Sequence, residues 1–143
     1  NPRIAPYLTE RRTTVFLAYQ DSLSTVQLLD YSDKVAITRF FPKIGYGPKV
    51  RDLITNMRKA WIAGGETIAV YQTASSGTNQ FVIVTRYKQG LKEREAGFRK
   101  PFIERYEAEN GNGSWGDYMD VLRNYLDHAY GELLVYRADL SSK

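Results

Sequence analysis

GELLVYRADLSSK, the stretch from Gly131 to Lys143, decides the fold. It follows a pattern of apolar residues at helical spacing that extends from Trp115 to Ala129. Gly131 is expected to end that helix, because glycine readily adopts the backbone conformation that closes a helix. The residues after it, Glu132 to Arg137, contain no helix-starting signal and are rich in apolar and aromatic side chains. We therefore predict that the chain ends in a β-strand.

The helix before this strand has a predicted start at Ser114. Serine caps a helix by accepting a hydrogen bond from a backbone N–H of the first turn. Asp117 stands three positions later, where a capping box places its acidic residue. The sequence NGNG at 110–113 marks the break before the helix.

Upstream segments carry equally clear strand and helix periods. Strand signals are the alternation of apolar and polar side chains, and helix signals are apolar residues three and four positions apart. Two of the strands are joined by a short turn, which predicts an antiparallel hairpin. In chain order the predicted elements are a strand at Lys34–Phe41, a helix at Val50–Trp61 stopped by Gly64–Gly65, strands at Glu66–Ser75 and Gln80–Lys88, and a helix after Gly90 that Pro101 kinks or restarts.

This order of elements matches the split βαβ arrangement of the ferredoxin-like fold. Right-handed crossovers place both helices on one face of the sheet. Both faces of the sheet carry apolar side chains, with Phe81 and Ile83 on one face and Val82 and Val84 on the opposite one. The helices cover one face, and a second copy of the sheet is the economical cover for the other. We predict an α+β, ferredoxin-like sandwich with an antiparallel sheet, helices on one face and homodimerisation through the other.

Residues 1–33 are predicted to form an N-terminal arm with one or two extra strands, before the ferredoxin-like domain at 34–143. The first twelve residues carry two prolines and three arginines and are expected to be a loose arm. Thr13–Tyr19 is rich in strand-forming residues. Ser24–Tyr31 fits either a second short strand or a helical turn.

Composition excludes several classes of function. The chain has 143 residues and no cysteine, which rules out disulfides, thiolate catalysis and cysteine-based zinc sites. Its net charge of +4 is spread out, with no run of Lys or Arg longer than two, so no nucleic-acid partner is expected. No apolar stretch approaches the ~20 residues that span a bilayer, so no membrane span is expected. The first residue, Asn1, fits a removed leader or a trimmed start, and an exported protein is slightly favoured over a cytoplasmic one.

Three segments resemble parts of small uncharacterised bacterial proteins of the dimeric α+β barrel superfamily. FPKIGYGPKVRDLITNMRKAW resembles their strand-to-helix junction, and VYQTASSGTNQFVIVTRYKQGLKE resembles their hairpin. ELLVYRADLSS resembles their L-L-R-Y-R-P-D-L-S ending, with Ala138 where those endings usually carry proline. The resemblance implies a homodimer whose two sheets face each other, and a pocket between sheet and helices in each subunit. No catalytic motif transfers with it.

Six residues are candidates for ligand binding. Polar groups on the hairpin could hold an acidic or carbonyl-bearing ligand, although Arg86 could instead pair with Glu66 or a helix carboxylate. The tryptophans could line a pocket or only fill the core. The single histidine is expected at the end of the last helix, half exposed, with a catalytic or haem-ligating role as the alternative. The candidates are Tyr71, Arg86, Tyr87, Trp61, Trp115 and His128.

Two classes of function remain open from the sequence. The first is a small-molecule-binding or accessory domain that uses no cofactor and holds a small organic ligand. The alternative is a cofactor-independent monooxygenase or isomerase of the antibiotic-biosynthesis-monooxygenase type. The single histidine and the lack of a facing acid–base pair favour the non-enzymatic class.

Overall fold

A computed structural model of the protein describes residues 14–140. The predicted loose arm at 1–12 lies outside these residues. In chain order the elements are β1 (Phe16–Tyr19), η2 (Asp21–Leu23), β2 (Lys34–Pro42), α1 (Gly47–Ala63), β3 (Ile68–Ser75), β4 (Phe81–Arg86), η3 (Leu91–Arg94), α2 (Phe102–Asn110), α3 (Ser114–Tyr125), β5 (Leu126–Val135) and η4 (Ala138–Leu140). No helix in this part of the chain has the length and apolar character needed to cross a membrane.

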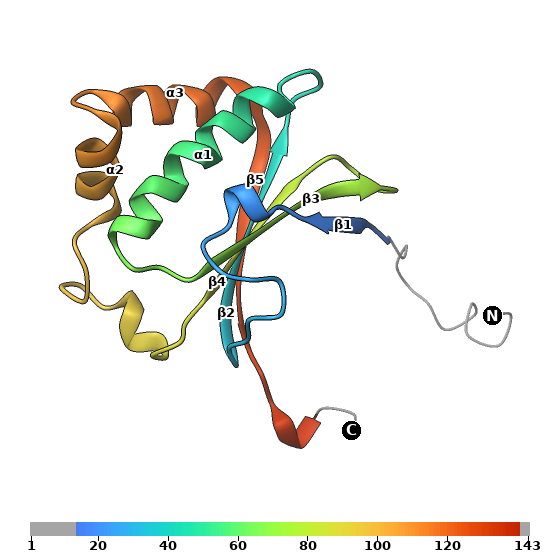
Figure 1. The fold of residues 1–143 in the computed structure, drawn as a ribbon. Coiled ribbons are helices and arrows are strands. Elements are labelled where there is room, and N and C mark those ends of the chain that lie inside the picture. The colour runs from blue at the N-terminus through green and yellow to red at the C-terminus, as the bar shows by residue number, and fades with distance from the viewer. Residues whose placement is uncertain (1–13, 141–143) are drawn as a thin grey trace, which may run out of the picture.

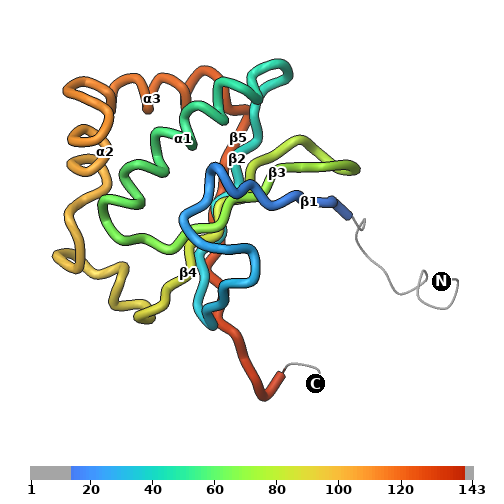
Figure 2. The backbone as a smooth tube through the Cα atoms, viewed as in Figure 1, coloured from blue at the N-terminus to red at the C-terminus, as the bar shows by residue number. Residues whose placement is uncertain are grey.

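The five strands form one antiparallel sheet in the order β1-β3-β4-β2-β5 (Figure 1). Without β1, this is the strand order of a ferredoxin-like domain. Figure 2 follows the two crossovers, one through α1 and one through α2 and α3, and both run on the same side of the sheet. The predicted α+β fold class, with helices on one face, is therefore confirmed.

The core lies between the sheet and the helices. All five residues of the predicted apolar stripe on α1 are buried: Val50, Leu53, Ile54, Met57 and Trp61. They share one cluster with Val70 of β3 and Phe81 of β4, neither of which has any exposed surface. Full burial of side chains of this size stabilises the fold by roughly 1.5–3 kcal/mol each, which fixes α1 on the sheet.

The boundary between α3 and β5 differs from the sequence prediction. The last helix does not continue to Ala129: it ends at Tyr125, and Gly131 lies inside β5, opposite Thr38. β5 pairs with the whole of β2, and these ladder hydrogen bonds replace the ones that residues 126–129 would make in a helix. The predicted terminal strand is confirmed, but it starts five residues before Gly131.

The cap of α3 also differs from the prediction. Ser114 is the first helical residue, and the N-cap is Gly113, whose φ of 85° is in the left-handed region that favours glycine. The hydroxyl of Ser114 is buried without a partner among residues 14–140. The carboxylate of Glu107 on α2 accepts hydrogen bonds instead, from the N–H of Gly113 at 2.7 Å and of Trp115 at 3.2 Å. A side chain from the preceding helix therefore performs the capping.

The region after Gly90 contains two short pieces where one interrupted helix is expected. η3 is a single 3₁₀ turn, and α2 begins at Phe102, directly after Pro101. Proline has no N–H to donate and restricts the residue before it to extended backbone, so it marks a restart here and not a kink.

The N-terminal part of the described chain covers one edge of the sheet. β1 pairs with β3. Residues 24–31 form neither the strand nor the helical turn that their sequence leaves open. Thr25 donates its N–H to the carbonyl of Ile68 and accepts the Ile68 N–H on its hydroxyl, each at 2.8 Å. This segment thus satisfies the backbone of β3 beyond the end of β1.

We predict that Glu107→Ala lowers the free energy of unfolding by about 1 kcal/mol, because it removes both acceptors at the start of α3. Ser114→Ala should change it little, since the serine hydroxyl makes no bond that would be lost. Urea denaturation measures both, with the exposed Glu109→Ala on the same helix as control. Equal losses for the Glu107 and Ser114 variants would contradict the assigned cap.

Candidate ligand pocket between the sheet and the helices

A pocket of about 310 Å³ lies between the sheet and the three helices. β2, β3 and β4 supply its floor, and the helices supply its roof. The floor residues are Thr38, Phe40, Ile68, Ile83 and Thr85, and the roof residues are Met57, Trp61, Phe102, Arg105 and Tyr118, with Glu66 at one end. Most of this lining is apolar, with a few polar groups among it, as in the binding sites of small organic ligands.

The floor follows from the two-residue period of the strands. Phe40 pairs with Phe81 and Thr38 with Ile83, so alternate residues of β2 and β4 face the helices together. Gly131 of β5 pairs with Thr38 on the other side. A Cβ placed at Gly131 would meet the Ile37 carbonyl at 3.5 Å and the Thr38 hydroxyl at 3.9 Å, so it would lie in ordinary contact beside Thr38.

An aromatic cluster from α2 and α3 holds the roof. Phe102 makes edge contacts with Trp115 and Tyr118, at centroid distances of 5.8 and 5.9 Å. Trp115 and Tyr118 stack at 4.5 Å. These contacts fix the orientation of the two rings, Phe102 and Tyr118, that line the pocket.

An ion pair between Arg105 and Glu66 lies at one end of the pocket. The side chain of Arg105, only 8% exposed, donates from Nη1 to Glu66 Oε2 at 2.8 Å and to the carbonyl of Ala60 at 2.6 Å. Its Nε donates to the carbonyl of Lys100 at 2.8 Å. Gly64 makes room for this path, because a Cβ there would lie 2.4 Å from Arg105 Nη1. The guanidinium is therefore held in place from three directions.

Further ion pairs extend this end into a network of two arginines and two glutamates. Arg99 approaches Glu66 at 3.4 Å and Glu93 at 2.8 Å. Both carboxylates are largely buried, at 16% and 4% exposure. Two positive and two negative charges compensate one another, as buried ion pairs must. The ionised groups around the pocket thus leave no uncompensated charge.

The hydroxyl group of Tyr118 is uncharged at ordinary pH. Burial, with a smaller contribution from neighbouring Tyr106, raises the pKa of Tyr118 to about 12. Its side chain therefore enters the pocket lining as a phenol and not as a phenolate.

The six sequence candidates do not converge on one site. Trp61 lines the pocket, and Trp115 packs behind its roof against Phe102 and Tyr118. Tyr87 lines a different cleft, of about 460 Å³, beside Arg94 and Glu93, where burial raises the pKa of Tyr87. The other three lie on the face of the sheet that points away from the helices.

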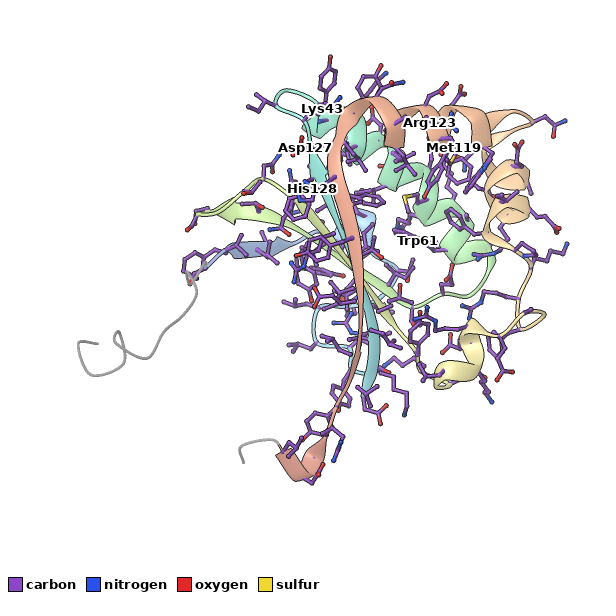
Figure 3. All side chains as sticks on the ribbon, turned by 180° about the vertical axis from the view of Figure 1, so that it is seen from behind. Lys43, Trp61, Met119, Arg123, Asp127 and His128 are labelled. Carbon is purple, nitrogen blue, oxygen red and sulfur yellow. The ribbon has the colours of Figure 1, made fainter. Side chains whose placement is uncertain are left out.

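On that outer face, Arg86 donates from Nη2 to the hydroxyl of Tyr71 at 3.5 Å. It does not pair with Glu66, which contacts Arg99 and Arg105. His128 belongs to β5 and not to a helix end, because pairing with Phe41 draws residues 126–129 into the sheet. Its ring stacks on Phe41 at a centroid distance of 4.1 Å, and its side chain is 53% exposed. Figure 3 labels His128 beside β5.

Of the residues that line the pocket, the sequence singles out only Trp61 as a candidate, and the polar residues that it misses include Thr38, Thr85, Tyr118 and Arg105. The threonines are visible in the sequence only as ordinary strand residues, and Tyr118 only as part of a helical stripe. Arg105 lies in an ordinary charged helix, and no local pattern distinguishes it. A larger cleft of about 610 Å³ lies on the other side of Arg105, but its lining is mainly charged and lacks an apolar floor.

Comparisons with known proteins add one distant likeness. No family model matches the chain, and no curated protein matches it. Among solved structures, the chain is similar to the crystal structure of an uncharacterized NIPSNAP domain protein from Burkholderia xenovorans. The identity is 15%, the match covers 76% of this chain and 99% of that one, and the TM-score is 0.49. The assignment of the fold class rests on the strand order of the sheet.

We predict that buried Tyr118 makes stability pH-dependent above pH 10. Its folded-state pKa lies above that of an unfolded tyrosine, so its contribution is intact below pH 10 and is lost as the pH rises through 12. Between these two pH values the free energy of unfolding of the wild type should fall by about 2 kcal/mol relative to that of Tyr118→Phe. Urea denaturation across this range measures the difference. The control is Tyr46→Phe, which removes the hydroxyl of a tyrosine that is 42% exposed. Parallel pH profiles for wild type and Tyr118→Phe would contradict the assignment.

Proposed function

We propose that this protein is a small-molecule-binding domain of the dimeric α+β barrel superfamily, with its ligand in the pocket between sheet and helices. The observation that carries the proposal is the pocket itself: about 310 Å³, mostly apolar, with a few polar groups at fixed positions. Pockets of this kind bury most of the surface of a small organic ligand. Trp61, a candidate from the sequence, is part of the lining.

Binding is favoured over acid–base catalysis by the chemistry of the lining. The lining contains no histidine, and its one carboxylate, Glu66, is bound to two arginines. The phenol of Tyr118 is a poor base at neutral pH, because its pKa is raised to about 12. These groups are suited to holding a ligand by hydrogen bonds and van der Waals contact.

The proposal includes a homodimer formed through the outer face of the sheet. β5 exposes Tyr130 and Leu134 on that face, at 49% and 44%, and Tyr136 beyond its end is 52% exposed. Val35 of β2 pairs with Leu134 in the same face, and Ile37 pairs with Glu132, which lies between Tyr130 and Leu134. A second sheet over this area would remove apolar surface from water at roughly 25 cal/mol per Å². Stable interfaces bury about 800 Å² on each partner.

Trp61 gives the first test of the pocket. We predict that a one- or two-ring aromatic ketone quenches tryptophan fluorescence saturably. Trp61→Phe should lose most of that quenching, while Trp115→Phe should keep it, because Trp115 packs behind the roof. No saturable change with any member of a panel of neutral and acidic aromatic compounds would contradict the proposed function. Oxygen uptake with a quinol substrate would instead support the monooxygenase alternative.

Two adjacent residues of β5 test the dimer. We predict that Leu134→Glu converts a dimer at micromolar concentration into a monomer, because it places a charge on the outer face. Leu133→Glu is the matched control. Leu133 is 45% exposed and Leu134 is 44% exposed, but Leu133 faces the helix side of the sheet. Sedimentation velocity measures both. A wild-type monomer, or equal dissociation in both variants, would contradict the proposed interface.

A further inference from the structure

Hydroxyl groups without partners mark the pocket lining. Thr38 on β2, Thr85 on β4 and Tyr118 on α3 all line it, and none of their hydroxyls makes a hydrogen bond within residues 14–140. These hydroxyls are not among the buried polar atoms that lack a partner, so they reach the open space of the pocket and are free to bond to a group that enters it. A ligand oxygen is the partner that this surrounding accommodates.

The two threonines are placed to act on the same ligand. Thr38 pairs with Ile83, and Thr85 lies two residues further along β4, so the threonines are diagonal neighbours on adjacent strands. Both stand among apolar side chains of the floor, such as Phe40 and Ile68. A flat ring lying on this floor would bring an oxygen on its edge within reach of a hydroxyl.

The charged end of the pocket argues against a charged ligand. Arg105 is bound to Glu66 at 2.8 Å, and Glu66 also contacts Arg99. A carboxylate entering the pocket would have to compete with Glu66 for Arg105, or stay buried without a counter-charge. Either situation costs free energy, because a buried charge must be paired.

We propose that the pocket selects an uncharged ring compound bearing a carbonyl or hydroxyl oxygen, which hydrogen-bonds to Thr38 and Thr85. This proposal rests on the proposed function and specifies its ligand class. The rings lie against Trp61, Phe102 and Ile83, and the oxygen points to the floor.

Three probes with the same ring system separate the contributions of the ring, the neutral oxygen and a negative charge to binding. They are indane, 1-indanone and indane-1-carboxylate. Calorimetry with the full chain should give the tightest binding for 1-indanone and the weakest for the carboxylate. Thr85→Val and Thr38→Val keep the shape of the side chain and remove its hydroxyl. We expect one or both substitutions to weaken the binding of 1-indanone by about 2- to 10-fold and to leave the affinity for indane unchanged. Thr55→Val, on an exposed position of α1, is the control.

A second measurement does not depend on any variant. The infrared carbonyl stretch of bound 1-indanone should lie at lower frequency than in an apolar solvent, as a hydrogen-bonded ketone requires. An unshifted carbonyl, or a carboxylate that binds tightest, would overturn the ligand class while leaving the pocket as a binding site. If none of the three probes binds or changes Trp61 fluorescence, the proposed function fails as well.

Discussion

The pairing of β5 with β2 is the constraint on which the rest of this structure depends. It extends over the whole of β2, from Lys34 to Pro42, and it fixes which residues of β5 face the helices. It ends α3 at Tyr125, whose carbonyl accepts the N–H of Lys43 at 2.9 Å. It also places Gly131 next to Thr38, which is part of the pocket floor. A shift of this register by one residue would exchange the two faces of β5, and with them the pocket wall and the outer surface.

Contacts made at a distance in the sequence hold the roof over that floor. Glu107 ties the start of α3 to α2, and Arg105 ties α2 to the end of α1 through the carbonyl of Ala60. Because Gly64 has no side chain, the guanidinium can pass close to the backbone at the end of α1. The aromatic rings of α2 and α3 are therefore fixed relative to the sheet by polar contacts at both ends, and the apolar cavity between them does not depend on ring packing alone.

The periodicity of the sequence predicts those elements whose structure is specified by their own residues. The stripe on α1 and the β3–β4 hairpin are confirmed because their own residues specify period and face. The start of β5 could not be predicted, since Leu126 and Ala129 suit a helical stripe as well as a strand, and only pairing with β2 decides between them. The cap of α3 depends on Glu107, which the chain brings close only after the turn at 111–113 has formed.

The pocket likewise depends on contacts between residues that are distant in the sequence. Trp61 is recognisable in a sequence, whereas Thr38 and Thr85 gain meaning only when β2 and β4 lie side by side.

The two faces of the sheet carry separable properties, because successive side chains on a strand point to opposite sides. Thr38 of β2 faces the pocket, and Ile37 next to it faces away, opposite Val84. Leu133 and Leu134 divide in the same way on β5. Substitutions on one face leave the side chains of the other in place, so the proposed ligand selection and the proposed self-association can be tested independently. Both proposed properties depend on the backbone of β2, which is hydrogen-bonded on one edge to β4 and on the other to β5. Damage to that strand would abolish both properties together, whereas damage to either face alone would abolish only one.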